Sequence, residues 1–598
     1  MPIPRGVVLI ILVWFGSVAP CLFFADIAGS SEAREVHIVD TMQRTGEWIL
    51  PTRNGLVPSK PPLTHWLALP LALVVGSAKT GMVRLVSLLA SVFMLVGVAL
   101  LTAQMAIAHR VNLTDKQIGT RHIWWSLLIT LSSYHFIRLA IDARVDMVFA
   151  ACITWSLYGG LSVINYGALE SSPRRKYLHI FFLGAALAIL AKGPLGIVLP
   201  VILTGLFAAS VIGIGATFRV YLRPDWSWLW MILPLSWYLS AAYRGGEVFI
   251  QRQLFFENID RILGAKEINN ETWWFYLPSF LHGFFPWSIL LLATSISLAV
   301  KWYKNRNTYI DFRVQSYYRA GWGLVIAFIS GIVIFSVAAG KRHSYLLPLV
   351  PLVSVYLALY GPIGLSALAK ILNKRLLGRL VSRLLNKIFG AWWVPVVIFL
   401  VILEVLKWID ISNYPRLAQY LISYIPIFQI FLVIIASVAC WFLWRMSVTL
   451  PPQAIMQKKR DFGLVAWSVV FSWTLILITG CKAALKPHRV AAQVINELVP
   501  INADLVAVRG RNDEYLDPVL YYLRRVVGLR SLEQALFECS SASSRDKFLI
   551  LEGALFYSSS FAGIVPLAEI VDEGRVGKKG EVAREKSIVL VSCPKEKK

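Results

Sequence analysis

Apolar segments long enough to cross a lipid bilayer follow one another along this chain up to residue 481. An α-helix needs about 20 predominantly apolar residues to span the hydrocarbon core. The first such segment follows Arg5 and is interpreted as a signal anchor in preference to a cleaved signal peptide. A shorter apolar run at 62–77 follows Lys60-Pro61 and is interpreted as an interfacial helix. We predict thirteen spans, at 6–24, 82–107, 122–139, 147–167, 177–191, 193–213, 226–243, 276–300, 320–339, 344–362, 392–409, 423–446 and 462–481.

The composition excludes an ordinary soluble protein. Of the 598 residues, 57% are hydrophobic, and the mean hydropathy is +0.63. A formal net charge of +25 would also suit a nucleic-acid-binding protein. The basic residues, however, lie in short loops between the apolar runs, where they set the topology of a membrane protein. We therefore predict an α-helical polytopic membrane protein with no nucleic-acid partner and with membrane lipids around it.

The charges of successive loops predict the sidedness of the chain. The outer loops at 25–61 and 244–275 are the richer in Asp and Glu. Counting 62–77 as a span would invert every later loop and break the alternation. The pattern places the N-terminus inside. We expect the location to be a bacterial cytoplasmic (inner) membrane, with the C-terminal residues on its extracytoplasmic side. With this orientation the inner loops of residues 1–485 are richer in Lys and Arg than the outer loops; they are 108–121, 168–176, 214–225, 301–319, 363–391 and 447–461.

Residues 486–598 differ in character from residues 1–485, which form the predicted transmembrane domain. Strand-like runs at Leu505–Val508, Phe548–Leu551 and Ile588–Val591 alternate with helix-like runs at Val490–Leu498, Pro518–Arg525 and Leu532–Cys539. This alternation predicts a small α/β domain, and the odd number of spans places it outside. Cys539 and Cys593 either pair there or remain thiols. The sequence has no CxxC or Cys/His ligand set, and it indicates neither zinc nor another divalent metal.

Carboxylates and cations gather on the predicted outer face. Glu32 belongs to the first outer loop, and Asp146 begins a span just after the next outer turn. Carboxylates can deprotonate an acceptor hydroxyl, and cations can stabilise a departing phosphate. Each group also has a structural alternative, such as a first-turn aspartate for Asp146 or a snorkelling side chain for Lys192. The other candidates on this face are Arg34, Lys60, Asp142, Glu257, Arg261, His282, Lys341, His343 and Tyr345.

These residues resemble, in order and spacing, the GT-C glycosyltransferases of the protein O-mannosyltransferase and aminoarabinose transferase (ArnT-like) superfamily. The resemblance implies a GT-C fold, a polyprenyl-phosphate sugar donor and activity on the non-cytoplasmic face. The family usually has an Asp-Glu pair in the first outer loop, where this chain has Ser31-Glu32. Ser59 replaces a Glu that often precedes the loop lysine, which argues against assuming the same acceptor or a metal there. The motifs that carry the resemblance are Glu32-Ala33-Arg34, Thr45-Gly46-Glu47-Trp48 with Pro51, Asn54-Gly55, Lys60-Pro61-Pro62 with Trp66, Arg84, Asp146, Lys192-Gly193-Pro194 with Pro200, Glu257-Asn258 with Arg261, Pro286-Trp287, and Lys341 with Tyr345 and Pro348.

The leading functional prediction is an inverting transferase. It would move a sugar from a polyprenyl-phosphate donor to a lipid, a glycan or a protein. Glu32 is the preferred general base, with Asp146 next. We expect Lys60, Lys192 and Lys341 to bind the donor phosphate, because an unpaired lysine at the membrane rim needs an anion. A lipid-linked sugar transporter or flippase is the alternative, although its charges would more often lie near mid-span. A structural or assembly protein is the third hypothesis.

Overall fold

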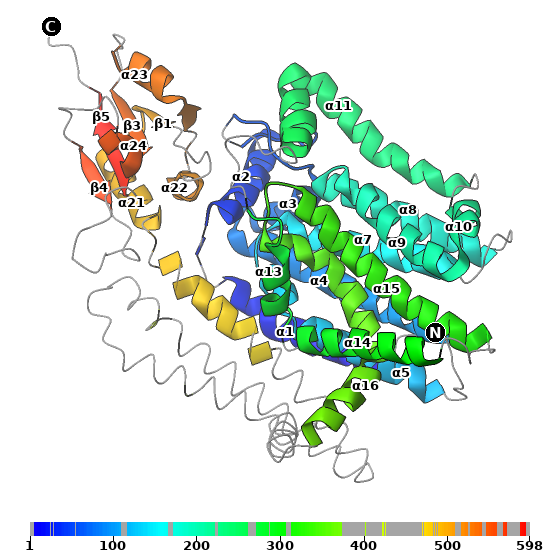
Figure 1. Ribbon diagram of the computed structural model, residues 1–598. Coiled ribbons are helices and arrows are strands. Elements are labelled where there is room, and N and C mark those ends of the chain that lie inside the picture. The colour runs from blue at the N-terminus through cyan, green and yellow to red at the C-terminus, as the bar shows by residue number, and fades with distance from the viewer. Residues whose placement is uncertain are drawn as a thin grey trace, which may run out of the picture.

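A computed structural model gives the fold (Figure 1). It describes residues 5–373 except 24–25, 28, 54, 109–115, 165–171, 222–224, 261–270, 286 and 306–311; then 401, 421, 423 and 425; and 469–593 except 471, 482, 485, 487, 509–515, 524, 526, 541–545, 559–565 and 571–586. The predicted spans at 392–409 and 423–446 lie almost wholly outside the described residues.

Helices occupy the other predicted spans wholly or in part. By length and composition, five of the described helices can cross a membrane, or six if one bent pair counts as a span. The α-helical membrane class is therefore confirmed, and the count of thirteen remains a prediction. The helices are α1 (Arg5–Val18), α4 (Thr80–Ala108), α5 (Lys116–Leu131), α6 (Tyr134–Ala140), α7 (Val145–Val163), α8 (Ser172–Lys192), α9 (Leu195–Ile212), α11 (Ile232–Phe249), α13 (Tyr276–Gly283), α14 (Trp287–Asn305), α15 (Phe312–Val337) and α16 (Val350–Asn373).

Two predicted spans are not single helices. The run at 276–300 divides into α13 and α14, which are sharply bent with respect to each other. Gly283 ends α13 against His135, and a Cβ atom on Gly283 would stand 2.1 Å from the His135 ring nitrogen. The run at 122–139 divides into α5 and α6 at Ser132 and Ser133. Hydropathy reports only that a segment avoids water, so it does not detect such breaks.

Small residues let the central helices pack closely. Helix α7 is buried along its whole length and contacts both α4 and α8. A Cβ atom on Gly159 would lie 2.5 Å from the backbone nitrogen of Phe181, and one on Gly184 would lie 2.7 Å from that of Ser156. The two backbones therefore approach each other through glycine, as is common between membrane helices. The Ser156 hydroxyl also donates a hydrogen bond across the contact to the Phe181 carbonyl, at 2.9 Å.

The first outer loop forms two helices. Helix α2 (Ser30–Thr45) is polar yet largely buried, because it lies between the helical bundle and the C-terminal part (Figure 1). It ends at Gly46, whose φ of 69° is the left-handed conformation that glycine adopts readily. Helix α3 (Leu63–Val75) has 13 residues, which is too short to span a bilayer. The predicted helix at 62–77 is thus present.

The C-terminal residues form a five-stranded sheet of order β2-β1-β3-β5-β4. Strand β1 pairs in parallel with β2 and β3, while β5 is antiparallel to both β3 and β4. Alternate strand residues face opposite sides, and apolar clusters with α21 and α22 cover one face and with α23 and α24 the other. The predicted strands and helices are all present. The structure adds strands β2 and β4 and helix α24, which the sequence did not predict. The bounds of all these elements are α21 (His488–Leu498), β1 (Asp504–Val508), α22 (Asp517–Leu523), β2 (Gly528–Arg530), α23 (Leu532–Ser540), β3 (Lys547–Glu552), α24 (Gly553–Ser558), β4 (Ala568–Ile570) and β5 (Ile588–Ser592).

Cys539 and Cys593 form a disulfide bond, with their Cα atoms 5.3 Å apart. The bond joins the end of α23 to the residue after β5, across a sequence separation of 54 residues. The first of the two predicted alternatives for these cysteines is therefore the observed one.

Candidate active site

A cavity of about 300 Å³ opens beside the start of α2 and the segment that precedes α7. Ser31 lies on its wall, at the position where the resembling family has its Asp. Four cationic side chains also line it: Arg138, Arg144, Lys341 and Arg342. Glu271 is the one carboxylate among its lining residues in the described part of the chain. His135, Leu139, Phe275, His343 and Ser344 complete the wall. We call this space the cationic pocket.

Most of the cations in the cationic pocket lack a carboxylate partner among the described residues. Within the described residues, Arg138, Lys341 and Arg342 form no ion pair with a carboxylate. Lys341 donates a hydrogen bond only to the backbone carbonyl of Glu271, at 3.0 Å. The Ser344 hydroxyl is buried, and no described group pairs with it. A buried hydroxyl is nearly always hydrogen-bonded in native proteins, and cations without a carboxylate partner make strong contacts with anions, so these groups indicate a site for an anionic ligand.

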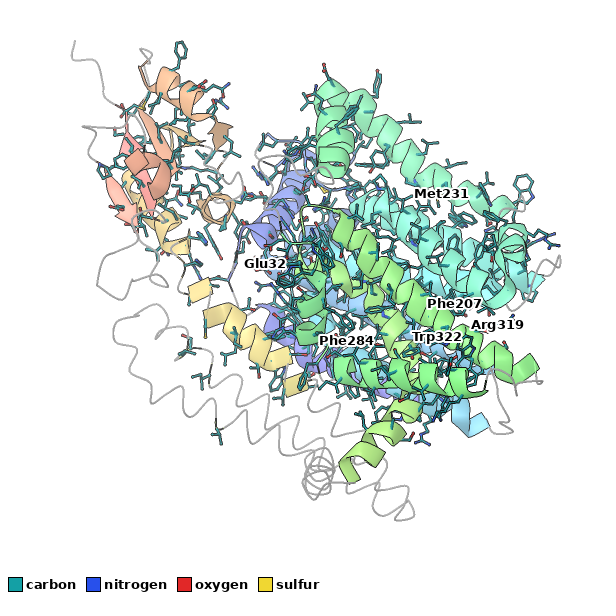
Figure 2. All side chains as sticks on the ribbon, viewed as in Figure 1. Glu32, Phe207, Met231, Phe284, Arg319 and Trp322 are labelled. Atoms are coloured by element: carbon teal, nitrogen blue, oxygen red, sulfur yellow. A yellow bond between two sulfur atoms is a disulfide. The ribbon has the colours of Figure 1, made fainter. Side chains whose placement is uncertain are left out.

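The Glu32 carboxylate is not free to act as a base in this pocket. Both of its carboxylate oxygens accept hydrogen bonds from Arg84, at 2.9 and 2.8 Å, and the Ala143 amide donates a third, at 3.1 Å. Burial alone would raise the pKa of Glu32, but Arg84 and the Ala143 amide lower it to about 2. The carboxylate of Glu32, which Figure 2 labels, thus joins α2 to α4 and to the loop before α7. Its basicity is low because its lone pairs are already used.

Asp142 is the more basic neighbour of Glu32. Burial raises the pKa of Asp142 to about 6; Arg144 opposes the rise, and the hydrogen-bonded Glu32 carboxylate adds to it. Its carboxylate lies 2.9 Å from the guanidinium of Arg144, which lines the cationic pocket. Asp142 therefore orients a pocket cation and offsets its charge when the carboxyl group is ionised.

Asp146 and Lys192 form a buried ion pair between the first turn of α7 and the last turn of α8. The Lys192 ammonium also lies 4.3 Å from the centre of the Tyr345 ring, a cation–π contact. Arg144 and Arg342 interact electrostatically with Asp146, which places this pair next to the cationic pocket. The structure thus brings the predicted residues Asp146, Lys192 and Tyr345 together, but they contact one another and do not line the cationic pocket.

Lys60 is likewise paired. Its ammonium lies 2.7 Å from a carboxylate oxygen of Glu257, and that carboxylate is largely buried. The premise that Lys60 and Lys192 lack an anionic partner is therefore wrong, because Glu257 and Asp146 provide the anions. Lys341 alone among the three predicted lysines lines the cationic pocket. That these lysines bind a phosphate remains a prediction.

The other residues predicted for the site lie in several different places, and within the described part of the chain only one of them lines the cationic pocket. Arg34 is buried against Glu35, 2.7 Å away, and Glu35 also pairs with His65, at 2.7 Å. His343 lines the cationic pocket, with its ring 4.8 Å from that of Phe275. His282 is exposed and makes an edge contact with Tyr134. Arg261 lies outside the described residues.

No group of three or more His, Cys, Asp or Glu in the described part of the chain is arranged to hold a metal ion.

Sequence reasoning did not single out Glu271 or His135, and it noted Arg342 only as part of the segment 340–345. Glu271 was one acid among several in the loop at 244–275, and nothing in that loop marked it. His135 lay inside a predicted span, where a histidine suggests a core position. The available signal was the break of that span at Ser132 and Ser133, which brings α6 to the rim. A spacing pattern along one helix cannot reveal a pocket built from four separate segments.

The fold is that of an ArnT-like GT-C integral membrane protein. The crystal structure of ArnT from Cupriavidus metallidurans in the apo state superposes with a TM-score of 0.65 at 16% identity, covering 98% of this chain and 98% of that chain. The structure of the same protein bound to undecaprenyl phosphate gives a TM-score of 0.61 at 16% identity, covering 99% and 97%. The predicted fold resemblance is confirmed.

Sequence comparison finds relatives of the same kind. The chain is 26% identical over 348 residues to an undecaprenyl phosphate-alpha-4-amino-4-deoxy-L-arabinose arabinosyl transferase of Shewanella sediminis, covering 56% of this chain and 55% of that protein. The corresponding protein of Pseudomonas aeruginosa (strain UCBPP-PA14) is 25% identical over 333 residues, covering 54% and 53%. An uncharacterized protein of Aquifex aeolicus is 26% identical over 333 residues, covering 55% and 67%. The match thus spans about half the length of these arabinosyl transferases. No family model matches the chain.

Proposed function

We propose that this protein is a membrane glycosyltransferase that moves a sugar from a polyprenyl-phosphate donor to an acceptor on the outer face of the membrane. The observation that carries the proposal is the cationic pocket, with four cations and one carboxylate at the rim of an ArnT-like fold. A lipid phosphate has the charge that such a pocket lacks. The relatives named as arabinosyl transferases use an undecaprenyl phosphate sugar, which supports the same donor class here.

In the proposed reaction, Arg138, Lys341 and Arg342 bind the phosphate of the donor. Their charge stabilises the phosphate as it leaves the anomeric carbon, so that no general acid is needed. Direct displacement by an acceptor hydroxyl inverts the anomeric configuration. The acceptor proton goes to a carboxylate, and we assign this role to Glu271 in place of Glu32 or Asp146. Glu271 lines the pocket and interacts electrostatically with His343, whereas Glu32 and Asp146 are held by Arg84 and Lys192.

The pocket cations provide the direct test. We expect Lys341→Gln and Arg342→Gln each to raise the KM for a polyprenyl-phosphate sugar by roughly tenfold or more, because a hydrogen bond to a charged group contributes about 1.5–3 kcal/mol. The measurement is transfer of labelled sugar from the donor by purified protein in liposomes. Lys304→Gln, an exposed lysine in the last turn of α14, is the matched control.

Unchanged KM values in both pocket variants would contradict the assignment of this pocket. Labelled sugar that crosses the bilayer without becoming covalently attached would instead favour the transporter alternative.

The location of the site on the extracytoplasmic side is part of the proposal. The first outer loop and the C-terminal residues are in contact: His37 lies 2.9 Å from the carbonyl of Asp517, and Arg53 lies 3.4 Å from its carboxylate. Both segments therefore belong on one side of the membrane. The Cys539–Cys593 disulfide supports the outer side, since such bonds persist in oxidising compartments.

Labelling of single cysteines checks this topology. Cysteines placed at Trp48 and at Phe537, whose side chains are 54% and 74% exposed, should react with a membrane-impermeant maleimide in intact spheroplasts. A cysteine at Lys304, on the predicted inner side, should react only after permeabilisation. Labelling of Lys304 but not of Phe537 in intact cells would overturn the orientation and the count of thirteen spans.

A further inference from the structure

A second cavity, of about 470 Å³, lies between the start of α4 and the helices α21 and α22. It shares no lining residue with the cationic pocket. Phe23 and Asp26 line it from the end of η1 (Ala19–Phe23) and the residues that follow, and Lys79, Thr80 and Gly81 line it from α4. Nothing in the proposed transfer reaction uses this space. We call it the junction cavity.

The α4 side of the junction cavity is suited to an anion. The amide groups of Thr80 and Gly81 open a helix of 29 residues, so no turn precedes them to accept their hydrogen bonds, and no described residue does so. The positive end of the helix dipole is directed at the same place. The Lys79 ammonium stands beside them, and no described residue accepts a hydrogen bond from its side chain.

The opposite wall adds a second cation and two amides. Arg489, Gln493 and Asn496 follow one another at spacings of four and three residues, so they share one face of α21. Arg489 lies 3.1 Å from Asp26, and both side chains are about half exposed, at 63% and 47%. Gln493 and Asn496 present both donors and acceptors, which suits hydroxyl groups.

Two tyrosines fix the geometry between these walls. The Tyr521 hydroxyl donates a hydrogen bond to the Ala78 carbonyl at 3.2 Å, and the Tyr522 hydroxyl accepts one from the Ile27 amide at 3.0 Å. Helix α22 is thus held against the outer end of the bundle, and the cavity between them is preformed. Phe23 is about half exposed where η1 follows α1, at the end of the predicted span 6–24.

We propose that the junction cavity binds a phosphate ester that carries hydroxyl groups, such as the headgroup of a phosphoglycerol or phosphosugar lipid. The phosphate contacts Lys79, Arg489 and the amides of Thr80 and Gly81, and the hydroxyl groups contact Gln493 and Asn496. The site does not depend on the transferase activity. The same chemistry occurs in a membrane lipid and in a soluble phosphate ester, and the binding measurement distinguishes these two sources.

Binding is measured on the full chain in nanodiscs and in detergent. The lipid arm compares phosphatidylglycerol with phosphatidylcholine nanodiscs, with retained lipid counted by native mass spectrometry. The soluble arm titrates glycerol 3-phosphate and inorganic phosphate in detergent. We expect retained phosphatidylglycerol, binding of glycerol 3-phosphate, or both.

Lys79→Gln combined with Arg489→Gln should weaken that binding by about tenfold or more, whereas Lys304→Gln should not. Retention of lipid alone assigns the site to the membrane, and binding of the soluble ester alone assigns it to a soluble ligand.

A further variant tests the hydroxyl contacts. Asn496→Ala should weaken binding of glycerol 3-phosphate while leaving inorganic phosphate, which has no glycerol hydroxyls, unchanged. The exposed position of Asn496 on α21 makes a folding defect a poor explanation for such a difference. Equal binding by the wild type and the Lys79→Gln/Arg489→Gln variant, or no binding of any of these phosphates by the wild type, would overturn the proposal.

Discussion

Replacing Glu271 with glutamine should lower the rate of sugar transfer by about 10²–10⁴-fold, the usual contribution of a general base. Binding of the polyprenyl-phosphate donor should stay equal or become tighter, because the substitution removes the one negative charge among the described residues that line the cationic pocket. The check is single-turnover transfer of labelled sugar, with donor binding measured separately. This split between turnover and binding distinguishes a base from a residue that only holds the donor.

Glu247→Gln serves as the matched control, because Glu247 is an exposed carboxylate in α11 and does not line the pocket. Its transfer rate should remain close to that of the wild type. Near-normal turnover of Glu271→Gln would contradict the assignment, and so would a loss of donor binding as large as the loss of turnover.

The sequence predicts the class of this fold well because the class depends on patterns that are local along the chain. A membrane helix satisfies its own backbone hydrogen bonds, so a run of apolar residues is enough to identify it. The alternation of strands and helices at 486–598 is equally local, and the predicted runs at Leu505–Val508 and Phe548–Leu551 are strands. The breaks at Ser132–Ser133 and after Gly283 depend on tertiary contacts, and hydropathy cannot detect them.

The site was predicted only as a set of residues on one face. The resemblance drew attention to Glu32, Lys60 and Lys192, but each of them has a partner from a distant segment: Arg84, Glu257 and Asp146. Whether a charged residue is neutralised depends on such long-range pairs, which a single sequence does not contain. Lys341 and His343 do line the pocket, because their whole segment, not one side chain, turns toward it.

The Glu32–Arg84 pair should matter more for stability than for the chemical step. Arg84→Gln leaves the Glu32 carboxylate buried without its cation, and removing one partner of a buried ion pair costs about 3–5 kcal/mol of unfolding free energy. Thermal unfolding in detergent, followed by tryptophan fluorescence, measures this loss. A double replacement, Glu32→Leu with Arg84→Met, should recover part of it, because it removes both charges. Stability of Arg84→Gln equal to that of the wild type would refute the structural role.

The unfolding temperature should depend on pH in a way that reveals Glu32 and its neighbour Asp142. The pKa of Glu32 is depressed from its usual value of 4.5 to about 2, so the stability that it contributes is present above pH 4.5 and is lost as the pH falls toward 2. The pKa of Asp142 is raised from 3.8 to about 6, so this group destabilises the fold increasingly as the pH rises from 3.8 through 6. The unfolding temperature should therefore rise as the pH is lowered from 7 toward about 4.5 and fall below it. Asp142→Asn should remove the rise, and Glu32→Gln should flatten the fall.

Below its unfolding temperature, Glu32→Gln should still transfer sugar at a rate within about tenfold of the wild type, far less than the loss expected from removing a general base. The reason is that Glu32 holds Arg84 and the Ala143 amide, and so positions the loop that carries Arg144 into the cationic pocket. A variant that folds normally but has lost its activity would return the role of general base to Glu32 and remove it from Glu271.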